Sequence, residues 1–209
     1  MPNGRRFRLT WRFAVAAMAV LVAACGSSGS SKEAGEPDTT TARCDPEAST
    51  ALDVPYASHP GTDPRLTSVD VYAPPRHGCE PLPVVVWVHG GAWITGDKSS
   101  RVDDKIALFG DAGYVFVSVN YRLTDPEAED PLRYPAHNED VAQALAWLVE
   151  SVDDYGGDPE KVAVLGHSAG AGIVAAIATD PRYLGAHDLG LDAIDCVAPW
   201  TPKPSTSRA

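Results

Sequence analysis

The chain is poor in the residues that mark several protein classes. Its 209 residues include four cysteines and six histidines, and no pair of cysteines and no histidine cluster has the spacing of a zinc site, so no metal is predicted. Lysine and arginine total 17 against 28 acidic residues, for a net charge of −11. The sequence lacks a basic stripe, and nucleic acid is therefore not an expected partner.

The sustained apolar run near the N-terminus is too short to span a bilayer comfortably. Residues 13–24 follow four arginines, which is the pattern of a signal peptide over residues 1–24. The run ends in Leu21-Val-Ala-Ala-Cys25, which resembles a bacterial lipobox with Cys25 as the lipidated residue. An ordinary secretory signal with a coincidental cysteine is the alternative. We expect export and lipid anchoring to the outer face of the bacterial cytoplasmic membrane.

The segment after the signal peptide has almost nothing to bury. Residues 25–43 are rich in Ser, Thr, Gly and Glu and are expected to form a flexible tether. Loss of residues 1–24 would take the net charge from −11 to −15, which leaves no polybasic patch for anionic lipid. Because export favours oxidation, a Cys44–Cys79 disulfide is expected. Cys196 lies in an apolar run and is expected to be a buried thiol.

Residues 44–200 are expected to form one α/β domain, followed by an unstructured tail over residues 201–209. Strands are predicted at 51–57, 67–72, 84–88, 114–119, 162–165 and 194–198, and helices at 103–111, 137–152 and 169–179. Strands that alternate with helices indicate a mostly parallel sheet with helices on both faces. A core-facing stripe is predicted on the second helix at Val141, Leu145, Leu148 and Val152.

A G-x-S-x-G motif joins a predicted strand to a predicted helix. Gly166-His-Ser-Ala-Gly170 follows the apolar run Lys161–Leu165 and precedes a small, apolar helix. In that setting the motif is a nucleophile elbow, which presents the Ser168 hydroxyl on a strained turn above the sheet. The flanking glycines are needed because a Cβ at either position would collide with the neighbouring strand or helix.

A glycine-rich turn follows an earlier buried strand. His89-Gly-Gly-Ala-Trp93 comes directly after Pro83–Val88. The backbone N–H groups of Gly91 and Ala92 could stabilise a developing oxyanion, together with the N–H of Ala169 after the serine. The alternative is a tight turn with no chemical role, with Trp93 packed in the core.

With these motifs the chain resembles the α/β-hydrolase esterases and lipases, a group that includes hormone-sensitive-lipase-like esterases, kynurenine formamidases and feruloyl-esterase-like proteins. The segments that match the family, in their order along the chain, are His89–Trp93 (which includes Gly90), Val119-Asn-Tyr-Arg122, Tyr134-Pro-Ala-His137 with Asp140, Gly157-Asp-Pro159 and Gly166–Gly170. The resemblance implies a serine nucleophile at Ser168 acting on a small ester or amide. It implies no cofactor, since this hydrolysis needs only water.

The triad acid and base cannot be assigned from the sequence. In this fold they follow the serine in the order Asp/Glu, then His, and only 41 residues follow Ser168. His187 is the one later histidine, with Asp180, Asp188, Asp192 and Asp195 as available acids, and none is convincing. The expectation is a domain that lacks the last strands and helices of the fold, with impaired activity because a serine without its base is a weak nucleophile.

Three functions remain open from the sequence. The first is a lipid-anchored serine esterase with its missing residues supplied unusually. The second is a catalytically dead, truncated hydrolase without function. The third is a surface lipoprotein that keeps the fold as a binding module.

Overall fold

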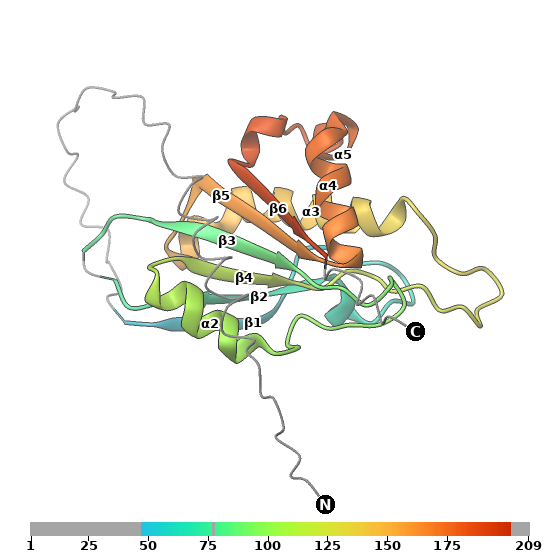
Figure 1. The fold of residues 1–209 in the computed structure, drawn as a ribbon, viewed down its shortest axis with the longest axis horizontal. Helices are drawn as coiled ribbons and strands as arrows, with labels where there is room; N and C mark the ends of the chain where they lie inside the picture. Colours follow the sequence, from blue (N-terminus) through green and yellow to red (C-terminus); the bar gives the residue numbers. More distant parts are fainter. Residues whose placement is uncertain (1–46, 77, 202–209) are drawn as a thin grey trace, which may run out of the picture.

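The computed structural model describes residues 47–76 and 78–201, which form a six-stranded sheet in the order β1-β2-β4-β3-β5-β6 (Figure 1). The strands are β1 (Ser49–Pro55), β2 (Ser68–Ala73), β3 (Leu82–Val88), β4 (Val115–Val119), β5 (Gly157–His167) and β6 (Cys196–Trp200). β1 pairs with β2 and β2 pairs with β4 in antiparallel fashion, while β4, β3, β5 and β6 are parallel. The predicted mostly parallel sheet is confirmed.

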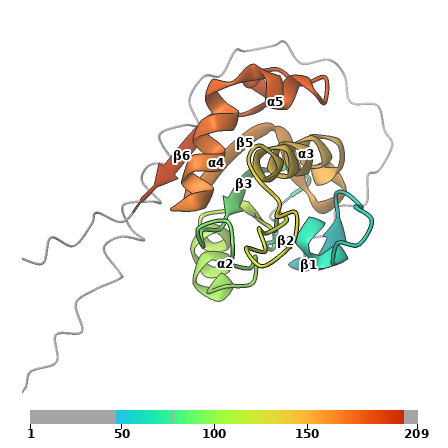
Figure 2. The ribbon, with the colours of Figure 1, turned by 90° about the vertical axis from the view of Figure 1, so that its right-hand side faces the viewer.

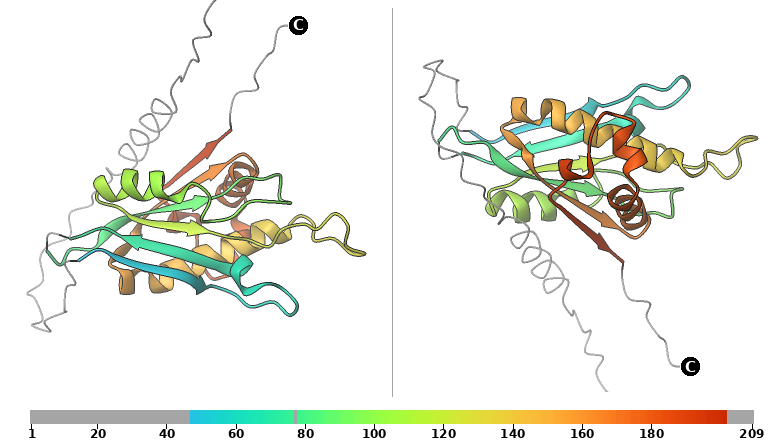
Figure 3. Two further views of the ribbon diagram at one scale, coloured as in Figure 1. Left: turned by 90° about the horizontal axis from the view of Figure 1, so that it is seen from below. Right: turned by 90° about the horizontal axis from the view of Figure 1, so that it is seen from above.

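Helices cover both faces of the sheet, as predicted. α2 (Val102–Asp111) lies on one face, and α3 (Ala136–Ser151) and α4 (Ala169–Thr179) lie on the other (Figures 2 and 3). α5 (Pro181–Gly185), which the sequence analysis missed, follows α4. Short 3-10 turns occur at Pro64–Thr67, Val152–Tyr155 and Leu191–Ala193. Across the described ranges, no helix combines the length and the apolar character that a membrane crossing requires.

The core has two layers because successive side chains of a strand point to opposite faces. Val84, Val86 and Val88 of β3 pack toward α3 and α4, whereas Val85 packs toward Phe109 of α2. Parallel strands that are covered on both faces are nearly continuous runs of β-branched residues, as here. The predicted stripe on α3 and the turn after it is confirmed: its four members, Val141, Leu145, Leu148 and Val152, are at most 2% exposed.

Two expectations about the last strand are corrected. β6 begins at Cys196 and extends to Trp200, whereas the prediction placed it at 194–198. Pro199 is tolerated within β6 because β6 is an edge strand of the described sheet, and one row of its backbone groups makes no ladder bonds. Cys196 is disulfide-bonded and not a free buried thiol. It is only half-buried at the start of the strand, so another sulfur can reach it.

Cys79 is also disulfide-bonded. Its expected partner Cys44 lies outside the described residues, and so do Cys25, the signal peptide, the tether and most of the predicted tail. The Cys44–Cys79 pairing therefore stays a prediction.

Candidate active site

The loops that follow β3 and β5 leave the sheet toward opposite faces. These strands are adjacent and parallel, and Val88 at the end of β3 pairs with Gly166 on β5. The loop after β3 leads to α2, whereas β5 leads directly into α4 on the other face (Figure 1). Such a divergence opens a crevice at the carboxyl ends of the strands, where ligands of open α/β sheets bind. Both predicted motifs lie at this crevice.

Ser168 occupies the turn between β5 and α4 in a conformation that few non-glycine residues adopt. Its φ is 53° and its ψ is −112°, and strain of this kind persists where the surrounding structure enforces it. The backbone N–H of Ser168 donates a hydrogen bond to the carbonyl oxygen of Trp200 at 2.9 Å. Ser168 itself is exposed. This is the strand–turn–helix context that the sequence predicted.

Glycines allow the neighbouring backbone segments to pack closely against the turn that carries Ser168. A Cβ at Gly170 would overlap the carbonyl oxygen of Val88, and a Cβ at Gly166 would overlap the carbonyl of Gly170. A Cβ at Gly90 would lie 3.0 Å from the Ser168 Cβ and 2.7 Å from the His167 carbonyl oxygen. The turn after β3 thus packs directly against the turn that carries Ser168.

The turn after β3 holds three successive residues at positive φ: Gly91 (132°), Ala92 (54°) and Trp93 (63°). The Gly91 carbonyl accepts from the N–H groups of Ile94 and Thr95, both at 3.1 Å. Within the described ranges, no protein acceptor binds the N–H groups of Gly91 and Ala92, and the Ala169 N–H belongs to the first helical residue, which has no intrahelical acceptor. These are the three groups predicted as oxyanion donors.

His89, the residue before this glycine-rich turn, packs against Tyr121. It is 5% exposed, stacks on the Tyr121 ring with 4.4 Å between centroids, and its carbonyl accepts from the Tyr121 hydroxyl at 3.0 Å. Burial lowers the pKa of His89, which favours the neutral ring. Trp93 is 43% exposed and so is not the core residue that the alternative interpretation required.

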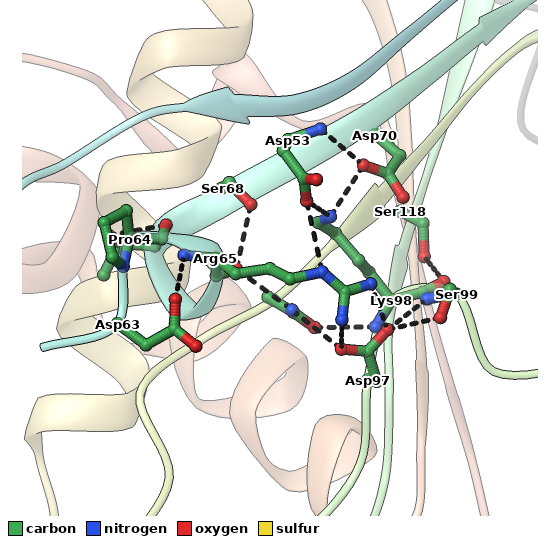
Figure 4. Close-up of polar contacts among 12 residues, drawn as sticks. Asp53, Asp63, Pro64, Arg65, Ser68, Asp70, Asp97, Lys98, Ser99 and Ser118 are labelled. Carbon is green, nitrogen blue, oxygen red and sulfur yellow. Dashed lines mark hydrogen bonds and ion pairs between the residues drawn. The ribbon is translucent and has the colours of Figure 1, made fainter.

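A buried charge cluster that the sequence analysis missed fixes the far end of the same turn (Figure 4). The Lys98 ammonium is fully enclosed and forms ion pairs with Asp53 on β1 and with Asp70 on β2, the latter at 2.7 Å. The Lys98 hydrogen bond is the main cause that lowers the pKa of Asp53. An acidic residue inside the apolar strand Ser68–Ala73 was the available signal, because such a group is buried only when it is paired.

Asn120, just past β4, connects this cluster to the backbone of the turn. Its side-chain oxygen accepts from the Lys98 N–H at 2.6 Å, and its amide nitrogen donates to the Arg65 carbonyl at 3.0 Å. Arg65 in turn forms an ion pair with Asp97 at 3.0 Å. The segment that leaves the turn after β3 is therefore held by groups from β1, β2 and β4.

Two other residues from the matching segments, Arg122 and Asp140, form a second ion pair, in which only the Asp140 carboxylate is fully enclosed. The Arg122 Nη2 lies 2.6 Å from Asp140 Oδ1. The backbone N–H of Arg122 also donates a hydrogen bond to Asp140 Oδ2, at 2.9 Å. Asp140 is 1% exposed, and its hydrogen bond is the main cause that raises the pKa of Arg122. Asp140 of α3 thus holds the segment after β4 against this helix. Its carboxylate is already engaged with Arg122 in this structural role.

The described histidines leave the Ser168 hydroxyl without a base. His167 lies between the rings of Trp87 and Trp200, with centroid distances of 6.4 and 4.8 Å. His187 follows α5, at the end of α4 remote from Ser168, and α4 is about 16 Å long. Among the described residues, no side chain forms a hydrogen bond with the Ser168 hydroxyl, and the triad acid and base stay unassigned.

Two cavities flank the turn after β3. One, of about 520 Å³, includes Ser168 and lies between α2 and the ends of β5 and β6; its wall includes Trp87, Lys105, Leu108, His167 and Trp200. Burial is the main cause that lowers the pKa of Lys105 to about 8. The other, of about 570 Å³, lies on the α3 and α4 side. Ala92 and Ile94 contribute to both. Nowhere in the described ranges do three or more His, Cys, Asp or Glu side chains gather as metal ligands would.

The chain is similar to known proteins. The chain is 32% identical over 161 residues to Esterase LipQ of Mycobacterium tuberculosis, which covers 73% of this chain and 35% of LipQ. It is 41% identical over 117 residues to Carboxylesterase NlhH of the same organism, or 56% of this chain and 35% of NlhH. A solved structure titled PNB esterase matches with a TM-score of 0.55 at 25% identity, over 68% of this chain and 39% of that one.

The chain thus spans about a third of the length of these curated relatives. Over residues 69–184 it matches the family described as BD-FAE. This match covers more than half of the chain, and both the turn after β3 and the Ser168 turn lie within it. The chain belongs to the BD-FAE family of α/β-hydrolase esterases.

Proposed function

We propose that this chain carries the nucleophile and the oxyanion donors of a serine carboxylic ester hydrolase that acts on small esters or amides. The strained, exposed Ser168 beside the unbonded N–H groups of Gly91, Ala92 and Ala169 is the observation that supports it. Ser168 Oγ attacks the carbonyl carbon, and the three N–H groups stabilise the oxyanion. Collapse expels the alcohol, which takes up the serine proton, and water then hydrolyses the acyl-serine.

Turnover by the chain as given is expected to be slow, because the serine proton needs an acceptor. Hydrolases that lose triad members retain roughly 10³–10⁴-fold catalysis over water from the oxyanion hole and substrate binding. A surface lipoprotein that binds a ligand without turnover is the second candidate. The observation in its favour is that both cavities are formed while the Ser168 hydroxyl has no basic partner among the described residues.

The test uses the purified chain with p-nitrophenyl acetate and a fluorophosphonate probe. The Ser168→Ala variant removes the proposed nucleophile, and Ser58→Ala, which removes an exposed hydroxyl in the loop after β1, is the matched control. We expect labelling that is lost in Ser168→Ala and kept in Ser58→Ala. Equal labelling of all three proteins, or of none while circular dichroism shows them folded, would refute the nucleophile assignment and favour the binding module.

The proposed location is the outer face of the bacterial cytoplasmic membrane, with Cys25 as the lipidated residue. The support is the lipobox-like sequence before Cys25 and the tether that follows it. Metabolic labelling with a fatty acid in a bacterial host would incorporate label into the chain and not into a Cys25→Ser variant. Label in both proteins would overturn the assignment.

A further inference from the structure

Lys105, near the start of α2, differs from the other described lysines in its charge environment. Lys98 and Lys161 each form an ion pair with an aspartate at 2.7 Å. The acidic residue next to Lys105, Asp104, pairs with Arg101 at 3.5 Å. Within the described ranges, Lys105 itself forms no ion pair, so no bound carboxylate stabilises its protonated form.

Three contacts hold the Lys105 side-chain nitrogen in place. It donates to the carbonyl oxygens of Ser100 at 2.8 Å and of Arg101 at 2.9 Å, and it lies 4.9 Å from the centroid of the Trp87 ring. An ammonium has three N–H donors, and the two carbonyls use two of them. A neutral amine would keep both hydrogen bonds and would gain a lone pair. Loss of the proton therefore breaks none of the hydrogen bonds that Lys105 makes here.

Lys105 is half-buried in the wall of the α2-side cavity, the name used here for the cavity of about 520 Å³ that includes Ser168. Burial is the main cause that lowers the pKa of Lys105 to about 8; the charge of Arg101 acts in the same direction, and that of Asp104 opposes it. The remaining charged or ionisable residues of the cavity wall are His89, Asp97 and His167. At about pH 7.5, about a quarter of an amine with this pKa is neutral, against about 0.1% of an ordinary lysine. A neutral amine at the wall of a cavity is a nucleophile.

Two tryptophans contribute to the apolar part of this wall. Trp87 contacts the Lys105 nitrogen, and Trp200 lies beyond it against His167, with 4.8 Å between the ring centroids. Leu108, three residues beyond Lys105 on α2, lines the same cavity. The volume is within the range of pockets that bind small molecules, and flat rings pack favourably against aromatic side chains. The cavity therefore favours an electrophile that carries an aromatic ring.

We propose that the α2-side cavity captures small aromatic aldehydes, which react with Lys105 to form imines. The Lys105 nitrogen bonds to the aldehyde carbon, and one of its protons passes to the aldehyde oxygen to give a carbinolamine. The hydroxyl group then leaves with the second N–H proton as water, and a carbon–nitrogen double bond remains. The reaction is reversible and needs no further reactant. It is independent of the proposed ester hydrolysis, so either assignment can fail while the other holds.

The test compares two lysines within one protein. The purified chain is incubated with benzaldehyde at about pH 7.5, sodium borohydride then reduces the imines to stable N-benzyl-lysines, and peptide mass spectrometry measures the modified fraction at each lysine. Lys161 is the internal comparison, because its side chain is 64% exposed and its hydrogen bond with Asp158 raises its pKa. The same reaction in urea, which unfolds the cavity, measures the intrinsic reactivity of both lysines. Cyclohexanecarbaldehyde, which is similar in size but not aromatic, tests the class of ligand.

We expect benzaldehyde to modify Lys105 at least about tenfold more than Lys161 in the folded chain, and to modify the two lysines about equally in urea. The preference for Lys105 should be smaller with cyclohexanecarbaldehyde. Lys105→Arg keeps the positive charge but offers no neutral amine, so it should abolish the main adduct, whereas the matched variant Lys161→Arg should keep it.

Equal modification of Lys105 and Lys161 in the folded chain would overturn the proposal, as would a preference for Lys105 that persists in urea. An undiminished preference with cyclohexanecarbaldehyde would overturn the assignment to aromatic aldehydes. Because the main comparison is made within the unmodified sequence, the result does not depend on whether Lys105→Arg folds.

Discussion

The backbone N–H of Ser168 donates a hydrogen bond to the carbonyl of Trp200, the last residue of β6, at 2.9 Å. The Trp200 ring also lies 4.8 Å from the imidazole of His167, with 35° between the planes. The strained turn that presents the proposed nucleophile is therefore held from β6 as well as from β5 and α4. The end of β6 is part of the scaffold of the candidate active site.

Trp200→Ala is expected to loosen this turn. Loss of a half-buried indole and of its contact with His167 should lower the free energy of unfolding by about 1–3 kcal/mol. Urea denaturation followed by circular dichroism measures this, and fluorophosphonate labelling of Ser168 should slow in parallel. Trp200→Phe keeps a ring against His167 and should recover most of the stability. A Trp200→Ala variant as stable as the wild type would contradict the role assigned to β6.

Gly170→Ala is expected to disrupt the junction of α4 with β3. The added Cβ would overlap the carbonyl oxygens of Val88 and His89, so the helix has to move away from the sheet. We expect a loss of at least about 3 kcal/mol, or an insoluble protein. Gly110→Ala in α2 is the control, since its Cβ would make a 3.7 Å contact with Pro74 and helix propensity predicts a gain of about 0.5–1 kcal/mol. Equal stabilities of the two variants would refute the packing argument.

Lys98→Met tests the buried charge cluster. It leaves the Asp70 carboxylate, whose side chain is 4% exposed, without its cation and should cost about 3–5 kcal/mol. Lys161→Met is the matched control: that lysine pairs with Asp158 at 2.7 Å, but its side chain is 64% exposed, so the expected loss is under about 1 kcal/mol. Thermal and urea unfolding of both variants measure the difference. A small loss in Lys98→Met would show that the cluster does not support the fold.

Stability is expected to fall as the pH drops below about 6.5. Burial lowers the pKa of His137 in the folded protein, so the unfolded chain binds its proton first on acidification. The contribution of a neutral His137 is therefore complete above about pH 6.5 and is lost as the pH falls. His137→Asn should flatten the dependence between about pH 7.5 and about pH 5.5, measured by urea unfolding. An unchanged slope in this variant would contradict the buried, neutral state.

The sequence predicted the parts of the site that depend on local pattern. The strand before Ser168, the turn and the small-residue helix after it follow from neighbouring residues, and so does the stripe on α3. The buried pairs Lys98–Asp70 and Arg122–Asp140 join residues far apart in the chain, and no periodicity shows which charges meet. The extension of β6 to Trp200 depended on its edge position, which only the assembled sheet determines.

The helices that carry the two halves of the site belong to different layers of the molecule. α2 follows the turn with the proposed oxyanion donors, and α4 begins at Ser168 on the other face of the sheet. Phe109 of α2 packs on one face of the sheet, whereas Ile173 and Ile177 of α4 pack on the other, so core substitutions reach each half of the proposed site from its own face. Because the turn after β3 contacts the Ser168 turn at Gly90, substitutions beneath the two helices are expected to have coupled effects on the proposed site.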